Sequence, residues 1–326
     1  MLLVSIIIPA YNSEKFIAAT IQTALDQTWS NKEIIIVDDG SSDNTLQIAK
    51  DFEIANANIK VYTQSNKGGC NARNKGFLLS KGDYIQFLDA DDLMDRQKIE
   101  KQMMKLQSKS DIIIGCRWIK FGNTPENNIG GTGPYESIRK DMTGIEWLLE
   151  RHMMICHAWL TPRKLIEASG GWDEALSCNQ DGEFFYRVIA GAKKVLYQDD
   201  TIVYYRISPN SNTVSVMNSE AKYVSLYKAA VSYKNVINGL TNHSDKAKAA
   251  IGNYFRELEY NYFYPSFPDL VRSCKEQEEY SFGNNKPELT GLTKTVAGFI
   301  GWKFSKRLAT WYKKLHTSVK QVKNEQ

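Results

Sequence analysis

Two clusters of acidic residues stand out in the first hundred residues, and each follows a short apolar run. Asp38 and Asp39 follow the run IIIV, and Asp89, Asp91 and Asp92 follow the run YIQFL. Carboxylates this close together repel one another unless a cation joins them, and Mg²⁺ or Mn²⁺ prefers oxygen ligands. The second cluster therefore indicates a divalent metal site. The alternative is an acidic loop that caps the following helix.

The other acidic positions are also ambiguous when each is taken alone. Asp38 and Asp39 precede GSSD, so they either stabilise a turn before a helix or hydrogen-bond a nucleoside. Asp181 begins the segment DGEFFYRV, whose apolar residues predict the start of a buried helix. A carboxylate at a helix N-terminus can be a simple cap.

The elements that must position these residues alternate between strand and helix. Apolar and β-branched runs predict strands over residues 4–8, 33–37, 59–63, 84–88 and 111–115. Apolar periodicity predicts helices over residues 14–27, 44–55 and 95–107. The alternation predicts an α/β fold with a mostly parallel sheet flanked by helices. Ligands bind beyond the carboxyl ends of such strands, and both acidic clusters lie there.

The alternation weakens after about residue 123, where GNTPENNIGGTGP predicts a loop. A mixed section follows, and residues 219–274 are predicted to be mainly helical. We therefore expect a catalytic domain of residues 1–215, a helical extension of residues 216–288 and a basic amphipathic tail of residues 289–326.

Charge is distributed unevenly along the chain. The formal net charge is +4, but residues 289–326 contain eight basic residues and a single acidic one, Glu325. Residues 1–288 are therefore slightly acidic, which argues against nucleic acid as a partner. A composition of 42% hydrophobic and 24% charged residues argues against both wholesale disorder and a multi-span membrane protein.

The five cysteines are scattered and never form a CxxC spacing. The apolar run at the N-terminus stops at Pro9 and has no basic segment before it, unlike a signal sequence. We therefore expect free thiols and a cytoplasmic protein. Cys156 and His157 are adjacent and His152 is close, but without a second spaced pair of ligands we interpret them as packed or solvated rather than metal-binding.

Six segments together carry a family resemblance: VSIIIPAYNSEKFI, IIIVDDGSSDNT, NKGGCNARNKGF, GDYIQFLDADD, SGGWDE and QDGEFFYRVIAG. In this order and spacing they resemble the family-2 glycosyltransferases with the GT-A fold. The resemblance extends from residue 3 to about residue 215. It implies transfer of a sugar from a nucleoside-diphosphate sugar to an acceptor hydroxyl, with inversion at the anomeric carbon.

The resemblance also implies a nucleotide-sugar site. Its expected residues, including Arg206 as a cation for the diphosphate, are Pro9, Tyr11, Asp38, Asp39, Arg73, Asp89 and Arg206. Asp89 and Asp91 form the DxD pair, with Asp89 near the ribose and Asp91 on Mg²⁺ or Mn²⁺. Asp39 favours UDP as the nucleotide, and Asp92 is expected to be a supporting residue. For Tyr11, a core aromatic is the competing interpretation.

On the acceptor side, the resemblance implies that Asp181 is the general base and that Trp172 lines the acceptor. Glu183 is a rival base, and Trp172 could instead belong to the core. Two positions depart from the family pattern: Gln180 stands where many members have Glu, and Ser208 where many have His.

Rival functions fit the sequence less well. A P-loop ATPase lacks its GxxxxGK(S/T) segment. A dinucleotide-dependent oxidoreductase lacks its GxGxxG segment, since PAYNSE follows the first strand. A nucleotidyltransferase would need an early phosphate-binding glycine and basic loop, which is not evident. A catalytically degenerate binding or scaffolding protein is disfavoured because Asp39, Asp89, Asp91 and Asp181 are all present.

The tail has the pattern of an interfacial helix. Apolar residues recur at steps of three or four: Val296, Ile300, Phe304, Leu308, Trp311, Leu315, Val319 and Val322. Basic residues flank this stripe. We expect it to dock the enzyme on the inner, anionic membrane face, near a glycan or lipid-linked acceptor. The alternative is a helix packed on the rest of the protein with a solvated basic face.

Overall fold

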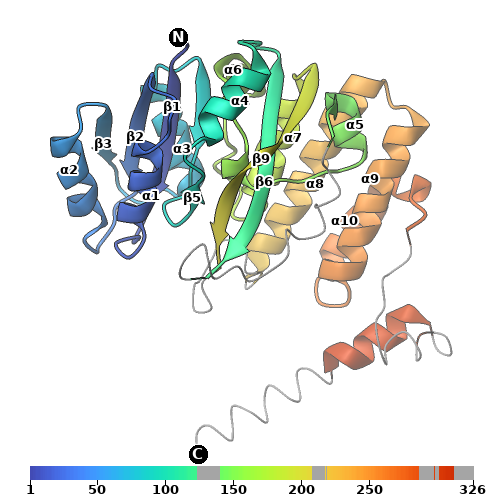
Figure 1. Ribbon diagram of the computed structural model, residues 1–326. Helices are drawn as coiled ribbons and strands as arrows, with labels where there is room; N and C mark the ends of the chain where they lie inside the picture. Colours follow the sequence, from blue (N-terminus) through green and yellow to red (C-terminus); the bar gives the residue numbers. More distant parts are fainter. Residues whose placement is uncertain (123–139, 208–216, 218, 286–296, 298–300, 312–326) are drawn as a thin grey trace, which may run out of the picture. The chain divides into compact units, whose positions relative to one another are not determined.

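The computed structural model describes residues 1–122, 140–207, 217, 219–285, 297 and 301–311 (Figure 1). The chain divides into two compact units, Met1–Val216 and Met217–Gln326. Residues 123–134 of the segment GNTPENNIGGTGP, predicted as a loop, and Ser208 lie outside the described residues.

A five-stranded sheet forms the centre of the first unit. Its strands, in spatial order, are β3 (Ile59–Thr63), β2 (Lys32–Asp38), β1 (Val4–Ala10), β4 (Tyr84–Phe87) and β8 (Thr161–Pro162). The first four are parallel and β8 is antiparallel to β4. Ile6, Ile7 and Ile8 are all fully buried, as expected of a parallel strand covered on both faces. The predicted α/β fold and its first four strands are confirmed.

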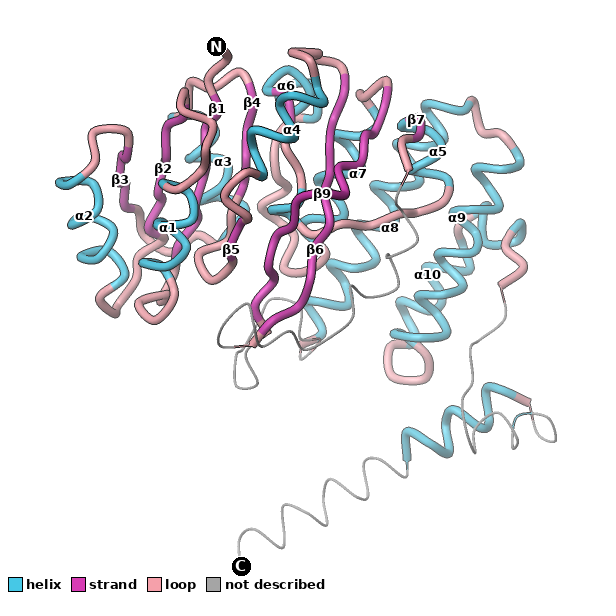
Figure 2. The backbone as a smooth tube through the Cα atoms, viewed as in Figure 1, coloured by secondary structure: helices cyan, strands magenta, loops and turns pink. Residues whose placement is uncertain are grey.

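Helices cover both faces of this sheet. In Figure 2, α1 (Ile17–Leu25) lies in front of the strands and α3 (Gly69–Leu79) lies behind them. Helix α2 (Thr45–Ala55) packs against β3. A Cβ atom added at Gly76 would lie 2.4 Å from a methyl carbon of Ile7, so α3 approaches β1 too closely for a side chain there.

A second sheet completes this unit, in the order β5 (Leu93–Met94), β9 (Lys194–Arg206) and β6 (Ile112–Phe121), with β7 (Met142–Thr143) also paired to β9. The long strands β6 and β9 are parallel. Sequence analysis predicted only the first part of β6 and did not predict β9. The polar residues QDD interrupt the apolar pattern of β9, and the register of the two strands shifts beside this interruption, between Cys116 and Arg117.

The remaining helices of the first unit support the two sheets. They are α4 (Lys98–Leu106), α5 (Gly144–Leu149), a short 3₁₀ helix (Cys156–Ala158), α6 (Arg163–Ser169) and α7 (Gln180–Ala190). Asp181 is therefore in the first turn of α7, as its sequence predicted. All five cysteines are free and buried, which confirms the expected thiols.

The second unit is helical, as predicted. It contains α8 (Glu220–Thr241), α9 (Asp245–Leu258) and α10 (Pro268–Glu276), whose buried residues include Ile237, Phe255 and Val271. Residues 302–311 form another helix, in which Trp302 contacts Tyr260 at a ring-centroid distance of 4.7 Å.

Five members of the predicted apolar stripe lie outside the described residues: Val296, Ile300, Leu315, Val319 and Val322. Among the helices of the described residues, none combines the length and the apolar character needed to cross a bilayer.

Candidate active site

Three loops at the carboxyl ends of β1, β2 and β4 form one side of the site. Pro9 lies near the end of β1, and Tyr11 follows that strand with 51% of its surface exposed. The structure therefore excludes the competing interpretation of Tyr11 as a core aromatic. Its exposed ring is available to a ligand beside the loop that follows β2.

Asp38 and Asp39 are both buried and hold that loop together. Asp38 Oδ2 accepts a hydrogen bond from the Thr63 hydroxyl at 3.1 Å. Asp39 Oδ1 accepts from the backbone N–H of Lys67 at 2.9 Å, and its Oδ2 accepts from the N–H of Gly68 at 2.7 Å. Asp38 has the expected supporting position. Asp39 joins the loop after β2 to the residues that precede α3.

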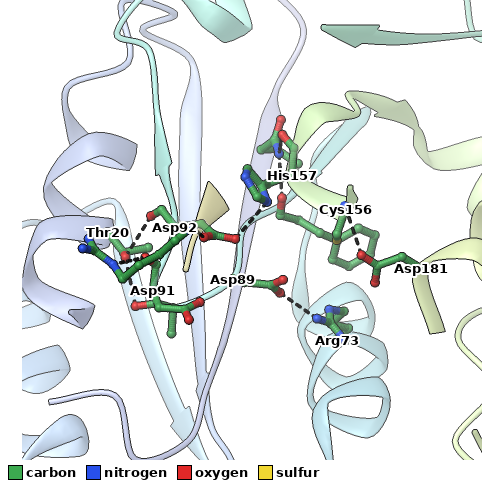
Figure 3. A network of polar contacts seen from close by, with 12 residues as sticks. Thr20, Arg73, Asp89, Asp91, Asp92, Cys156, His157 and Asp181 are labelled. Atoms are coloured by element: carbon green, nitrogen blue, oxygen red, sulfur yellow. Dashed lines mark hydrogen bonds and ion pairs between the residues drawn. The ribbon is translucent and has the colours of Figure 1, made fainter. Parts of the chain in front are cut away.

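Asp89, Asp91 and Asp92 lie in the turn between β4 and β5, and several groups fix this turn. The hydroxyl of Thr20 lies 2.9 Å from the Ala90 carbonyl oxygen and 3.0 Å from that of Asp92 (Figure 3). From β9, the backbone N–H of Arg206 donates to Asp92 Oδ1 at 2.7 Å. The turn is thus held from helix α1 on one side and from strand β9 on the other.

Arg206 braces this turn instead of projecting freely toward a diphosphate. Its Nε donates to the carbonyl oxygen of Asp91 at 2.7 Å, and one terminal nitrogen donates to that of Gly122 at 3.0 Å. The guanidinium lies over the rings of Phe16 and Phe121, at 4.7 and 4.3 Å from their centroids. We therefore correct the expected diphosphate contact of Arg206, because its side chain already contacts backbone carbonyls and aromatic rings.

The Asp91 carboxylate differs from its neighbours. It is half-buried, and it has no hydrogen-bond or ion-pair partner from another side chain in the part of the chain that is described. Burial and the nearby Asp89 carboxylate raise the pKa of Asp91 to about 6. A cation at this carboxylate would relieve both effects, so its environment fits a divalent metal.

Asp89 is paired with Arg73 of α3. An Arg73 terminal nitrogen lies 2.6 Å from Asp89 Oδ1. Burial alone would raise the pKa of Asp89, but the Arg73 guanidinium holds it below its usual value. Two further Arg73 nitrogens, Nε and Nη1, are buried and have no hydrogen-bond partner. Arg73 therefore fixes Asp89 and places a positive charge beside it.

Trp172 lies directly behind Arg73, with the guanidinium carbon 4.6 Å from the ring centroid. Its other contacts include Phe184, stacked at 4.0 Å with an interplanar angle of 12°. Only 3% of Trp172 is exposed. We therefore correct the expected acceptor-side role: the tryptophan is a buried support for Arg73 and offers no open face to a sugar.

His157 completes the site and was missed at the sequence level, where we interpreted it as a packed or solvated imidazole. Its Nδ1 lies 3.1 Å from Asp92 Oδ2, and both side chains are almost completely buried. Ligand atoms of Asp89, Asp92 and His157 lie within 4.8 Å of one another, so these residues are a second group able to hold a metal. The only sequence signal was its place after a cysteine, which points to no particular partner.

Burial favours the neutral forms of both Asp92 and His157. Burial and the carboxylates of Asp91 and Asp89 raise the pKa of Asp92 well above its usual range. Burial lowers the pKa of His157 to about 4, against the opposing effect of Asp89. A neutral imidazole beside Asp92 therefore fits a supporting role, as expected for Asp92.

Asp181 faces this cluster from α7. Its Oδ2 accepts a hydrogen bond from the backbone N–H of Cys156 at 3.1 Å (Figure 3). Burial raises the pKa of Asp181 to about 6, while Arg73 opposes the shift and Asp89 adds to it. A carboxylate with this pKa is charged at neutral pH and can still accept a proton, as a general base must.

Glu183, the rival base, lies elsewhere on α7. Its two carboxylate oxygens each accept a hydrogen bond from Arg187 at 2.7 Å, and only 4% of the residue is exposed. A buried carboxylate in a two-point ion pair with Arg is a poor proton acceptor. The geometry therefore favours Asp181. Gln180 points away, since its side-chain amide donates to the Leu176 carbonyl at 2.7 Å.

Known proteins with similar sequences are glycosyltransferases. The sequence model of the family described as glycosyl transferase family 2 matches residues 5–170. EpsJ of Bacillus subtilis, an uncharacterized glycosyltransferase, is 32% identical over 65% of this chain and 63% of its own length. An uncharacterized glycosyltransferase of Rickettsia typhi is 30% identical over 69% of this chain and 70% of its own length.

Among solved structures, S. aureus TarS 1-349 in complex with UDP-GlcNAc has a similar fold. The TM-score is 0.62, the sequence identity is 18%, and the alignment covers 79% of this chain and 82% of TarS 1-349. At this identity, the likeness supports the fold and leaves the chemistry to be argued from the residues.

Proposed function

Because the chain belongs to glycosyl transferase family 2, we propose that it transfers a sugar from a UDP-linked donor to a hydroxyl of a glycan or lipid-linked glycan, with inversion. The observation that carries this proposal is the convergence of Asp89, Asp91 and Asp181 near the guanidinium of Arg73. Such a site has a group for each end of the reaction: carboxylates toward the donor and a base toward the acceptor.

On the donor side, the exposed Tyr11 ring and the loop held by Asp39 would receive the nucleoside. UDP is favoured because the TarS structures with a similar fold contain UDP or UDP-GlcNAc, and because Asp39 matches uracil-contacting members of the family. Asp91 would hold Mg²⁺ or Mn²⁺, which when bound offsets charge on the leaving diphosphate. The unpartnered Arg73 nitrogens would add a second positive group nearby.

On the acceptor side, Asp181 would remove the proton of the attacking hydroxyl. The Cys156 N–H keeps one of its oxygens in place, so the other is available to the acceptor. The oxygen of the acceptor then bonds to the anomeric carbon as the bond to the diphosphate breaks. A single displacement of this kind inverts the anomeric configuration.

A panel of UDP-, GDP- and dTDP-sugars, each assayed with Mn²⁺ and a range of glycan acceptors, tests the proposal. We expect release of UDP from one or more UDP-sugars, faster with an acceptor, and a product of inverted configuration by NMR. A scaffolding protein would bind a nucleotide sugar without releasing UDP. A nucleotidyltransferase would instead form pyrophosphate from a nucleoside triphosphate, and a retained configuration would exclude the single displacement.

We also propose that the C-terminal segment docks on an anionic membrane. Within the helix of residues 302–311, Phe304, Leu308 and Trp311 are 56%, 49% and 61% exposed and are spaced by four and three residues. They therefore share one face of that helix. Lys303 and Arg307 are exposed beside them. An apolar face bordered by basic residues matches the headgroup region of an anionic bilayer.

Replacing Phe304, Leu308 and Trp311 with Ser is expected to lower recovery with phosphatidylglycerol vesicles in co-sedimentation by about tenfold or more, since three apolar side chains leave the bilayer. The matched control replaces Ile54 and Leu78, which are 85% and 82% exposed on α2 and α3. It should bind vesicles as the unmodified protein does. Equal binding by both variants, or binding equally strong to neutral vesicles, would refute the anchor.

A further inference from the structure

A buried polar cluster of Gln86, Lys98 and Gln102 holds three consecutive backbone carbonyls. Gln86 Nε2 donates to the carbonyl oxygen of His157 at 2.9 Å. Gln102 Nε2 donates to that of Ala158 at 3.1 Å, and Lys98 Nζ donates to that of Trp159 at 3.1 Å. The donors come from β4 and α4, so two separate elements fix one short segment.

These three side chains are unusual residues for a protein core, because each is 0% exposed. Lys98 Nζ also donates to the side-chain oxygen of Gln86, and no carboxylate of the described residues forms an ion pair with it. Burial lowers the pKa of Lys98 to about 8. A buried ammonium without a counter-charge destabilises a fold relative to an apolar side chain of similar volume. Stability alone therefore does not account for this lysine.

The segment that they hold contacts both halves of the site. The backbone N–H of Cys156 donates to Asp181 Oδ2 at 3.1 Å, on the acceptor side. The imidazole of His157, one residue later, lies 3.1 Å from Asp92 Oδ2 in the turn that carries the DxD pair. Any shift of residues 156–159 along α4 would disturb the two contacts together.

We propose that Gln86, Lys98 and Gln102 are positioning residues, which fix residues 156–159 so that Asp181 and the turn of Asp89 to Asp92 keep their relative placement. The inference rests on the proposed function for its kinetic consequence. That the cluster immobilises residues 156–159 does not depend on which reaction the protein catalyses. The three side chains contact neither donor nor acceptor, and they act only through the backbone of residues 156–159.

Lys98→Met tests the proposal, because it keeps an unbranched side chain only one atom shorter and removes both the charge and the donor. Hydrogen–deuterium exchange of the free protein should become about tenfold or more faster in the peptide that contains residues 156–159, because the Trp159 carbonyl loses its donor. Turnover should fall by about tenfold, since the base and the turn of Asp89 to Asp92 lose their relative alignment.

The pH profile provides a readout that general loosening of the fold would not give. Asp181 faces Arg73 on α3, Asp89 after β4 and the Cys156 N–H. Loss of that N–H removes a bond to the charged carboxylate while both charged neighbours remain. The acid limb of turnover should therefore move to higher pH in Lys98→Met.

The matched control is Lys101→Met on the same helix. Lys101 Nζ donates to the backbone carbonyl of Asp200 at 2.6 Å, so this variant also removes a lysine-to-backbone bond, but outside residues 156–159. It should alter neither the exchange of that segment nor turnover. If Lys98→Met does not fold, Gln102→Met, which removes a neutral donor from the same segment, is expected to give the same pattern.

Unchanged exchange of residues 156–159 in both cluster variants, or an equal loss of turnover in Lys101→Met, would overturn the proposal. Exchange needs no substrate, so the two proposals fail separately. If the unmodified protein releases UDP from no sugar in the panel, the proposed function fails. The exchange of residues 156–159 still decides whether the cluster fixes this segment.

Discussion

Asp181→Asn is expected to lower turnover by about 100- to 10,000-fold while the donor KM stays within about twofold. The amide has nearly the same shape, but it cannot take the proton of an acceptor hydroxyl. The carboxylate lies at the start of α7 and bonds to the Cys156 N–H, away from the nucleoside loops of Tyr11 and Asp39. Steady-state kinetics with a saturating acceptor, together with donor binding by calorimetry, separates the two effects.

The pH dependence supplies a second check on the same residue. A general base works when it is deprotonated, and burial raises the pKa of Asp181 to about 6. Turnover of the unmodified protein should therefore rise with pH through about 6 and then level off. Glu183→Gln is the control: it breaks the ion pair with Arg187, so the melting temperature should fall, but this acid limb should remain. Normal turnover in Asp181→Asn with loss in Glu183→Gln would reverse the assignment.

The first four strands of the first sheet could be predicted because each is a nearly uninterrupted apolar run. The runs that form β1 and β2 consist mainly of β-branched residues buried on both faces, so the apolar signal is nearly continuous. Strand β9 lacks such a run: its middle residues QDD are polar, and its pairing with β6 shifts register there. Strand β9 forms because it pairs with β6, which is distant in sequence. A local sequence pattern does not predict such a distant partner.

The site residues also differ in whether the local sequence alone predicts their positions. Asp38, Asp39, Asp89 and Asp91 each follow a predicted strand, so the parallel sheet alone brings them to one edge. The positions of His157 and Trp172 depend on how later segments of the chain pack against that edge of the sheet. The sequence around His157 contains no spaced ligand pair, and the resemblance implied an acceptor-lining role for Trp172, whose ring instead stacks on Phe184.

For Arg206, the sequence placed the residue at the site correctly, but the structure gives it a different contact from the one expected. The family resemblance implied that this residue is a cation for the diphosphate. In the structure, β9 pairs beside β5, so Arg206 faces the turn of Asp91 and Asp92 and donates to its backbone. A contact of this type is not evident from sequence, because it depends on the register of β9 against two strands.

Asp91→Asn is expected to lower turnover by at least about 1,000-fold and to remove the metal dependence of nucleotide binding. Asp91 is the carboxylate of the DxD pair without a partner side chain in the described residues, whereas Asp89 is already paired with Arg73. An amide at position 91 loses the negative charge that a divalent cation requires. Calorimetric titration of UDP, with Mn²⁺ and with excess chelator, measures this loss without relying on turnover.

The control for this prediction is Asp95→Asn, a change of the same kind four residues along. Asp95 accepts a hydrogen bond from the Gln97 backbone N–H at 2.9 Å and lies beyond β5, so it should keep both turnover and the Mn²⁺ effect. The unmodified protein should bind UDP more tightly with Mn²⁺ than with chelator, and Asp91→Asn should bind it equally weakly in both. If Mn²⁺ still strengthens UDP binding to Asp91→Asn, the cation is held elsewhere, and Asp89, Asp92 and His157 become the group to test. Undiminished transfer by the unmodified protein in excess chelator would exclude a metal role for Asp91, because the carboxylate would then serve the reaction without a cation.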